Sequence, residues 1–288
     1  MDSIQISSVS ELIKYYKELP LNNSSFCFRG QSNFSWTLQP TIYRYENFMR
    51  YQTLILETNL LKKKPKNALP PLTFTDSDLE WLMLSQHYGV PTRLLDWSTD
   101  ILVSLFFACH EEDQFNSDGA LFICNQDEYN TCSTYQSTMH IQKLHFIRPN
   151  IGNPRLQAQS GCFMIWGHSP LNSNISKESY DLYQYHKSTS KSYFLKKLLI
   201  PKNRKSFILD ELKQSKISFE SLYYPNGYND QKLSSEFKSI KEEIRILSIL
   251  QTDSKRLTNS ERILANSSGI DTTDMFHNCV SLKQIIYK

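Results

Sequence analysis

The 288-residue sequence predicts an α+β fold in which helices cover a small mixed or antiparallel sheet, with a helical arm at the C-terminus. Three observations predict this class. Apolar residues recur at helical spacing in several segments, and short continuous apolar runs typical of buried strands lie scattered among them. The hydrophobic fraction of 40%, with only eight Gly and eleven Pro, is that of a folded chain and not of a disordered one.

The N-terminal region is predicted to contain a helix, two extended pieces and a second helix. Ser8 or Ser10 can cap the first helix, and Pro20 ends it. Gly30 interrupts the aromatic strand that follows, and Pro40 lies within the second extended piece. In chain order, these elements cover residues 8–19, 26–29, 36–43 and 45–64.

Two further helices enclose a polar segment. Asp76 or Ser77 can cap the first of them and Gly89 ends it, whereas Thr99 or Asp100 can cap the second. The two helices cover residues 76–87 and 99–110. We expect the residues between them to form a turn and a loop.

Strands and helices both follow in the rest of the chain. The predicted strands cover residues 119–124, 162–166 and 196–201, and the predicted helices cover residues 205–215 and 234–251. Lys, Glu, Ser and Asn dominate beyond Tyr228. We therefore expect a main domain over residues 1–232 and a helical extension over residues 233–288, which would be an arm for a protein partner.

Charge and cysteine content exclude some classes of protein. A net charge of +3 is too small to mark a nucleic-acid binder by itself, although basic residues cluster at 62–66 and 196–205. The six cysteines lack the spacing of a zinc site, so we expect no metal and interpret them as buried thiols of a reducing compartment. No secretory signal or membrane-spanning stretch is visible, which predicts a cytoplasmic protein without membrane contact.

Arg29 stands near the end of a predicted strand, directly before Gly30 and Gln31. Because glycine has no side chain, a ligand or another backbone can approach closely there. An arginine so placed offers a fork of fixed donors that suits a phosphate or a carboxylate. A structural ion pair between Arg29 and Asp96 would use the same residue types, so both interpretations stay open.

A dense polar segment follows the helix that ends at His87. Thr92, Arg93 and Asp96 lie within one predicted loop, and Tyr88 stands beside the histidine. A lone histidine is more often structural, but this clustering favours His87 and Asp96 as residues that carry chemistry. For Arg93 the leading interpretation is an ion pair with Asp96 that stiffens the loop.

Two weaker signals follow. Ser98, Thr99 and Asp100 form a helix start whose free amide groups suit an anion, although capping alone explains their residue types. Gln157 and Gln159 stand one residue apart before a predicted strand, a spacing that places two side chains on one face of a strand. No P-loop, zincin or serine-hydrolase motif occurs.

Three blocks of the sequence resemble the FRG domain, a family named for its Phe-Arg-Gly signature. Residues 28–31 read Phe-Arg-Gly-Gln, and residues 86–98 with the apolar run 105–108 resemble the longer second block. Residues 159–163 resemble the third. The likeness covers about residues 20–230, and the second block is highly specific because so many positions agree in order. Since the family occurs in bacteria and phages, the resemblance implies a protein of such origin.

The same blocks are similar, more weakly, to ADP-ribosyltransferases that use NAD. Those enzymes carry in order an Arg on the first strand, a Ser-Thr-Ser motif and a Glu-x-Glu motif. Arg29, Ser98-Thr99 and Gln157-Ala-Gln159 fall in that order here. The likeness implies that Arg29 holds NAD and that Ser98 and Thr99 brace the pocket. The sequence departs from the pattern at Gln159, because a neutral glutamine cannot stabilise an oxocarbenium-like transition state by its charge.

These signals predict a nucleotide-type site in an intracellular protein, with NAD-dependent ADP-ribosyl transfer in a toxin or in phage defence as the activity. The alternative is a non-catalytic module that binds nucleic acid or a protein, and a third hypothesis gives the same residues a purely structural role. Tyr43 or Tyr88 would stack on a ring of the nucleotide. The residues expected to act in catalysis are His87, Asp96 and Gln159, and those expected to bind the cofactor are Arg29, Gly30, Gln31, Tyr88, Arg93, Ser98 and Thr99.

Overall fold

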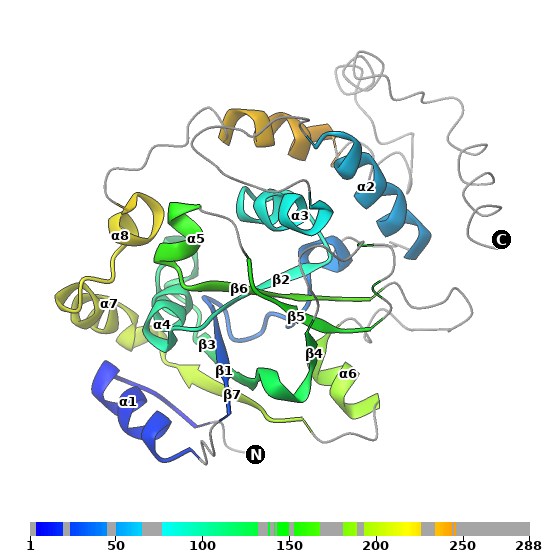
Figure 1. Ribbon diagram of the computed structural model, residues 1–288. Coiled ribbons are helices and arrows are strands. Elements are labelled where there is room, and N and C mark those ends of the chain that lie inside the picture. The colour runs from blue at the N-terminus through cyan, green and yellow to red at the C-terminus, as the bar shows by residue number, and fades with distance from the viewer. Residues whose placement is uncertain are drawn as a thin grey trace.

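A computed structural model of the protein describes residues 4–19, 24–44, 50–64, 77–131, 138, 141, 143–149, 153–167, 181–188, 193–225, 234–243 and 245. These residues form one seven-stranded sheet with helices packed around it (Figure 1). The strand order is β4-β5-β6-β2-β1-β3-β7, and every pair of neighbouring strands except β4 with β5 is antiparallel. The expected α+β class is therefore confirmed.

The strands predicted over residues 26–29, 119–124, 162–166 and 196–201 are present, and the sequence does not predict three others, one in the middle of the sheet and two at one edge. The strands are β1 (Phe26–Gln31), β2 (Leu94–Ser98), β3 (Gly119–Asn125), β4 (Asn130–Thr131), β5 (His145–Ile147), β6 (Gly161–Ile165) and β7 (Leu195–Ile200). The loop predicted between the two central helices is wrong, because β2 occupies it. Leu94, Leu95 and Trp97 are buried there, and β2 pairs along its whole length with β6, a partner far away in the sequence.

The helices of the described residues include four that begin within two residues of a predicted start and three short ones that the sequence does not predict. They are α1 (Val9–Lys17), α2 (Arg50–Lys62), α3 (Asp78–His87), α4 (Ile101–Cys109), α5 (Pro154–Ala158), α6 (Leu182–Ser188), α7 (Lys205–Gln214) and α8 (Phe219–Tyr223), with 3₁₀ turns η1 (Thr41–Arg44), η2 (Glu112–Gln114), η3 (Gln126–Glu128) and η6 (Lys202–Arg204). Ser8, Ser77 and Asp100 accept hydrogen bonds from backbone amides in the first turns of α1, α3 and α4. These contacts confirm the predicted caps.

Two local predictions are wrong. The extended piece predicted over residues 36–43 consists of turns followed by η1, whose Ile42 and Tyr43 are buried. Gln157 lies in the short helix α5 and not on a strand, because Asn153 caps that helix with its side chain and Pro154 begins it. The two glutamines therefore do not share one face of a strand.

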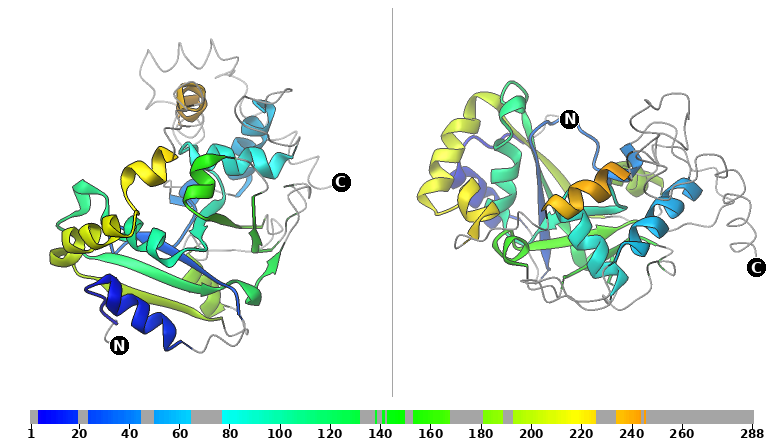
Figure 2. Two further views of the ribbon diagram at one scale, coloured as in Figure 1. Left: turned by 60° about the vertical axis from the view of Figure 1, so that its left-hand side comes forward. Right: turned by 90° about the horizontal axis from the view of Figure 1, so that it is seen from above.

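Two apolar clusters of buried residues pack against the sheet. Helices α1, α4 and α7 contribute to one of them, and Figures 1 and 2 show these helices side by side. Helix α4 packs so closely on β1 that a Cβ atom at Gly30 would lie 1.9 Å from the carbonyl oxygen of Ser104. The glycine of the Phe-Arg-Gly signature is thus required for the approach of another backbone.

The C-terminal region is described only in part. Residues 234–243 are helical, and Phe237 is buried against Trp81 and Tyr88, with ring centroids 5.1 and 4.6 Å apart. Apart from residue 245, the remaining residues of the predicted helix and the extension to residue 288 lie outside the described residues. The division of the chain at residue 232 stays a prediction.

The described cysteines agree with the expected buried thiols. Cys27, Cys109, Cys124 and Cys162 are buried and free, while Cys132 and Cys279 lie outside the described residues. Among the helices of the described ranges, none is both long enough and apolar enough to cross a membrane.

Candidate functional site

The sheet opens between β1 and β2. These strands share a single register pair, Phe28 opposite Ser98, whereas β1 pairs with β3 from Phe26 to Gln31 and β2 pairs with β6 from Leu94 to Ser98. Beyond the shared pair, the residues of β1 and β2 that would otherwise face one another line a pocket of about 320 Å³. Residues of α3, α4, α5 and α8 complete its walls.

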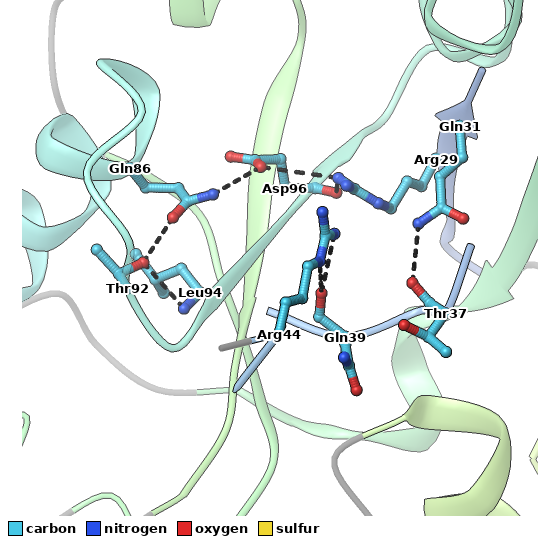
Figure 3. A network of polar contacts seen from close by, with 9 residues as sticks. All are labelled: Arg29, Gln31, Thr37, Gln39, Arg44, Gln86, Thr92, Leu94 and Asp96. Carbon is cyan, nitrogen blue, oxygen red and sulfur yellow. Dashed lines mark hydrogen bonds and ion pairs between the residues drawn. The ribbon is translucent and has the colours of Figure 1, made fainter. Parts of the chain in front are cut away.

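Arg29 reaches across this opening from β1 to β2 (Figure 3). Its Nη1 donates to the backbone carbonyl of Asp96 at 2.6 Å and lies 3.7 Å from the Oδ2 atom of the same residue. Its buried Nε has no hydrogen-bond partner among the described residues. Burial lowers the pKa of Arg29 to about 10, and the charge of Asp96 opposes this shift. The guanidinium therefore stays charged at neutral pH and has a donor to spare.

Asp96 is held from its other side by a chain of hydrogen bonds. Gln86 Nε2 donates to Asp96 Oδ2 at 3.0 Å, and Thr92 Oγ1 donates to Gln86 Oε1 at 2.7 Å. The backbone amide of Leu94 in turn donates to Thr92 Oγ1 at 3.1 Å. Figure 3 shows this chain leading from the start of β2 to the carboxylate. The arrangement fixes the orientation of a carboxylate whose side chain is 45% exposed.

A second guanidinium lies close to the first. Arg44, at the end of η1, donates from Nε and Nη2 to the carbonyl oxygen of Gln39 at 3.3 and 3.1 Å. Burial lowers the pKa of Arg44, and its positive charge contributes to the lowered pKa of Arg29. Two like charges held together in a partly buried site repel one another, so an anionic ligand between them would be favoured.

Several residues of the pocket carry buried polar atoms without a partner among the described residues. They are Nε of Arg29, Oε1 of Gln31, Nε1 of Trp97 and Oγ of Ser104. Buried polar groups are nearly always hydrogen-bonded in folded proteins, because an unpaired one costs about 1–3 kcal/mol. The wall of this one pocket therefore contains several buried polar groups without a partner among the described residues.

Most of the site residues predicted from the sequence meet in this pocket. Seven of the ten line it: Arg29, Gly30, Gln31, His87, Asp96, Ser98 and Gln159. Ser98 Oγ donates to the carbonyl oxygen of Gln159 at 2.8 Å, and Gln159 Nε2 donates to that of Leu222 at 3.2 Å. Ser98 therefore links the end of β2 to the segment before β6.

The other three predicted residues are not among those that line the pocket. The ring of Tyr88 stacks on Phe237, and Thr99 Oγ1 donates to the carbonyl oxygen of Ser160 at 3.3 Å. Arg93 is fully buried and forms an ion pair of 2.6 Å with Glu57. Its structural role agrees with the leading interpretation, but the predicted partner, Asp96, is wrong.

Sequence reasoning missed several residues of the pocket. Gln86 stands within the second block of the FRG resemblance, so that block was its signal. The others have no signal in the local sequence, because only the packing of distant elements brings them together. They are Trp36, Arg44, His110, Glu111, Arg155 and Tyr223. The expected stacking residue Tyr43 is buried in the core. The aromatic residues that line the pocket are Phe28, Trp36, Trp97, Phe107, Phe163 and Tyr223.

Comparison with known families identifies one match. The model of the FRG domain family matches residues 24–117, which include Arg29, His87 and Asp96. No curated protein and no solved structure matches the chain. The weaker similarity to ADP-ribosyltransferases has no counterpart in these comparisons and stays a prediction.

Proposed function

Given the FRG domain at residues 24–117, we propose that the pocket between β1 and β2 binds a nucleotide, with NAD as substrate and ADP-ribosyl transfer as the reaction. One observation carries this proposal. Arg29, Asp96, Ser98 and Gln159 come from three separate sequence blocks and line the same pocket from β1, β2 and the residue pair before β6. Arg29, Ser98 and Gln159 stand in the chain order that the weak likeness to ADP-ribosyltransferases describes.

The charges around the pocket favour an anionic ligand. Arg29, Arg44 and Arg155 line it together with only two carboxylates, those of Asp96 and Glu111. Guanidinium groups present planar forks of donors that match phosphate oxygens, and such charge-assisted hydrogen bonds are about twice as strong as neutral ones.

Aromatic side chains offer surfaces for the rings of a nucleotide. Trp36 lies in the pocket wall with 36% of its surface exposed, and the guanidinium of Arg155 lies 4.9 Å from the centroid of the Tyr223 ring. Stacking of a base on an aromatic or guanidinium plane is worth about 1–3 kcal/mol per base. A pocket that holds both aromatic rings and guanidiniums suits a ligand that joins a heterocycle to a phosphate.

The reaction would break the bond between the ribose C1′ and the nicotinamide nitrogen of NAD. The electron pair leaves with neutral nicotinamide, positive charge develops on the ribose, and an acceptor hydroxyl or water adds to C1′ and releases a proton. Asp96 is a carboxylate held in a fixed orientation, which suits it to stabilise that charge. Gln159 donates to the carbonyl oxygen of Leu222 and contributes no charge. We assign acceptance of the proton to His87, which lines the pocket.

The basic clusters give weaker support for nucleic-acid binding, because only some of their cations, such as Lys62, Lys196 and Lys202, are exposed and free of ion pairs within the described residues. In the first cluster, Lys63 and Lys64 form ion pairs of 2.7 Å with acidic side chains, and Lys66 lies outside the described residues. In the second cluster, Lys205 is fully buried and donates to the carbonyl oxygen of Ser32 at 2.6 Å. A surface that tracks phosphates needs exposed and uncommitted cations.

Incubation of the protein with labelled NAD tests the proposal. We expect binding of NAD and release of nicotinamide by the wild type, and loss of both in the Arg29→Ala variant. His87→Ala should retain binding and lose turnover. Arg245→Ala is a matched control, because this arginine pairs with Glu242 on the same helix and does not line the pocket. A wild type that neither binds nor cleaves NAD would refute the proposal.

The proposed role as a toxin or in phage defence rests on the same reaction. If the enzyme consumes NAD or modifies a target in bacterial cells, its expression should arrest growth, and the Arg29→Ala variant should not. That outcome would support a toxin or phage-defence role, whereas equal growth with both proteins would count against it.

A further inference from the structure

A helix over residues 234–243, called the C-terminal helix below, lies outside the residues that the family model matches. Figure 1 shows it in orange, beside α2 and α3. Lys63 pairs with Glu243 at 2.7 Å, and the buried ring of Phe237 lies 5.1 Å from the ring of Trp81 on α3. The C-terminal helix is therefore packed against the helix whose last residue, His87, lines the pocket.

Tyr88 connects the C-terminal helix to the pocket wall. Its ring stacks on Phe237, with the centroids 4.6 Å apart and an angle of 4° between the planes. The Cζ atom of Arg155, which lines the pocket, lies 5.8 Å from the centroid of Tyr88 and 4.9 Å from that of Tyr223. These four side chains, called the Arg155 cluster below, form a continuous series of contacts from the C-terminal helix to the pocket.

The rings of the Arg155 cluster hold a cation in place without a counter-charge of their own. An aromatic ring attracts a guanidinium through its quadrupole and, unlike a carboxylate, leaves the positive charge intact. A guanidinium held in this way can still attract an anion. Fixing a long side chain before the ligand arrives also lowers the conformational entropy that binding costs.

We propose that Phe237 is a positioning residue of the pocket and that, through Tyr88, it holds Arg155 where the guanidinium binds the phosphate of the ligand. The proposal rests on the proposed function and adds a segment beyond the matched residues to the site. Phe237 and Tyr88 are not among the residues that line the pocket, so their effect on a ligand passes through Arg155.

Nicotinamide mononucleotide and nicotinamide riboside are the probes that test this role, because they differ only in the phosphate. We expect the wild type to bind the mononucleotide on the order of tenfold to a hundredfold more tightly than the riboside, as for hydrogen bonds between charged groups. Titration calorimetry measures this phosphate preference. Arg155→Gln, which removes the charge, should lower the preference about tenfold.

Phe237→Leu keeps an apolar side chain on the C-terminal helix but removes the ring that stacks on Tyr88. It should lower the phosphate preference about threefold to fivefold and leave the affinity for the riboside nearly unchanged. Tyr88→Leu interrupts the Arg155 cluster from the other side and should lower the preference by a similar factor. Circular dichroism establishes that each variant is folded, and Tyr88→Leu carries the test if Phe237→Leu does not fold.

A double-mutant cycle separates positioning from a general loss of packing. In the Arg155→Gln background, Phe237→Leu should cause no further loss of preference, because the residue through which it acts is already absent. Phe26→Leu is the matched control. Phe26 is also buried and in contact with another ring, that of Phe194 at 5.4 Å, and neither residue lines the pocket. This control should keep the full preference.

The outcomes distinguish this role from the proposed function. A Phe237→Leu variant that keeps the preference, effects of Phe237→Leu and Arg155→Gln that add, or an equal loss in Phe26→Leu would overturn the positioning role and leave the nucleotide pocket standing. A wild type that binds neither the two probes nor NAD would overturn both.

Discussion

Arg29 and Arg93 belong to the same domain and both reach carbonyl groups on neighbouring segments, but their surroundings differ. The Arg93 side chain is fully buried, and its donors reach both carboxylate oxygens of Glu57 as well as the carbonyl oxygens of Thr138 and Trp166. Arg29 donates to one carbonyl, faces a carboxylate at 3.7 Å and keeps a buried Nε without a partner among the described residues.

This contrast teaches which arginine is structural and which is available to a ligand. A guanidinium whose donors are all hydrogen-bonded has none left for a ligand. Its buried ion pair is stable only while both partners remain. A guanidinium next to a pocket that has fewer hydrogen bonds than it can donate is able to form new ones with a bound ligand. The same distinction separates two carboxylates, Glu57 in the core and Glu111 in the pocket.

Removal of the Glu57 charge should have the largest effect on stability. Glu57→Gln leaves the buried Arg93 without its counter-charge, so the free energy of unfolding should fall by about 3–5 kcal/mol. Urea denaturation followed by fluorescence measures it. Asp96→Asn, which alters a partly exposed pair, should cost less than about 1 kcal/mol. Equal losses of unfolding free energy in the two variants would contradict the distinction between the buried and the partly exposed ion pair.

Arg29→Lys should lower the affinity for the ligand more than it lowers the stability of the fold. Lysine keeps the charge but loses the planar fork and the Nε donor, so the affinity for nicotinamide mononucleotide should fall about tenfold. The unfolding free energy should change by no more than about 1 kcal/mol. Calorimetric titration and urea denaturation of one preparation measure both quantities. An unchanged affinity would show that the guanidinium of Arg29 does not bind the ligand.

Gln86→Leu should have a smaller effect, confined to the pocket. The substitution removes the donor that orients Asp96, which is worth about 1 kcal/mol, so kcat for nicotinamide release should fall about fivefold with little change in KM. Thr92→Val, one step further along the chain of hydrogen bonds, should act in the same direction and more weakly. A rise in KM at constant kcat would instead assign Gln86 to ligand binding.

Glu111→Gln should have the smallest effect on stability, with a sign opposite to that of Glu57→Gln. Because burial raises the pKa of Glu111 above its ordinary value of 4.5, ionisation costs stability as the pH rises past that value. Removing the charge should therefore stabilise the protein slightly at neutral pH. The difference from the wild type should vanish in acid, where the carboxylate is protonated in both the folded and the unfolded state. Denaturation curves at several pH values test the sign, and a destabilised variant would contradict it.

Local signals predicted most of the helices and part of the site. Ser8, Ser77 and Asp100 lie where capping residues must lie, and their neighbours repeat at helical spacing, so the start of each helix follows from adjacent residues. The same reasoning failed for β2, since a strand with a polar residue in its middle is recognised only through the partners that bury it. It also misplaced Gln157, where the capping signal of Asn153 was overlooked.

The sequence by itself determined the α+β class, the caps and the FRG resemblance at Arg29, His87 and Asp96, because each depends on residues that are close along the chain. Only the tertiary structure decided which arginine is saturated, which carboxylate it pairs with, and that β1 and β2 separate after one register pair to leave a pocket. Such choices depend on contacts between segments far apart in sequence, whose geometry is fixed by packing and not by local preference.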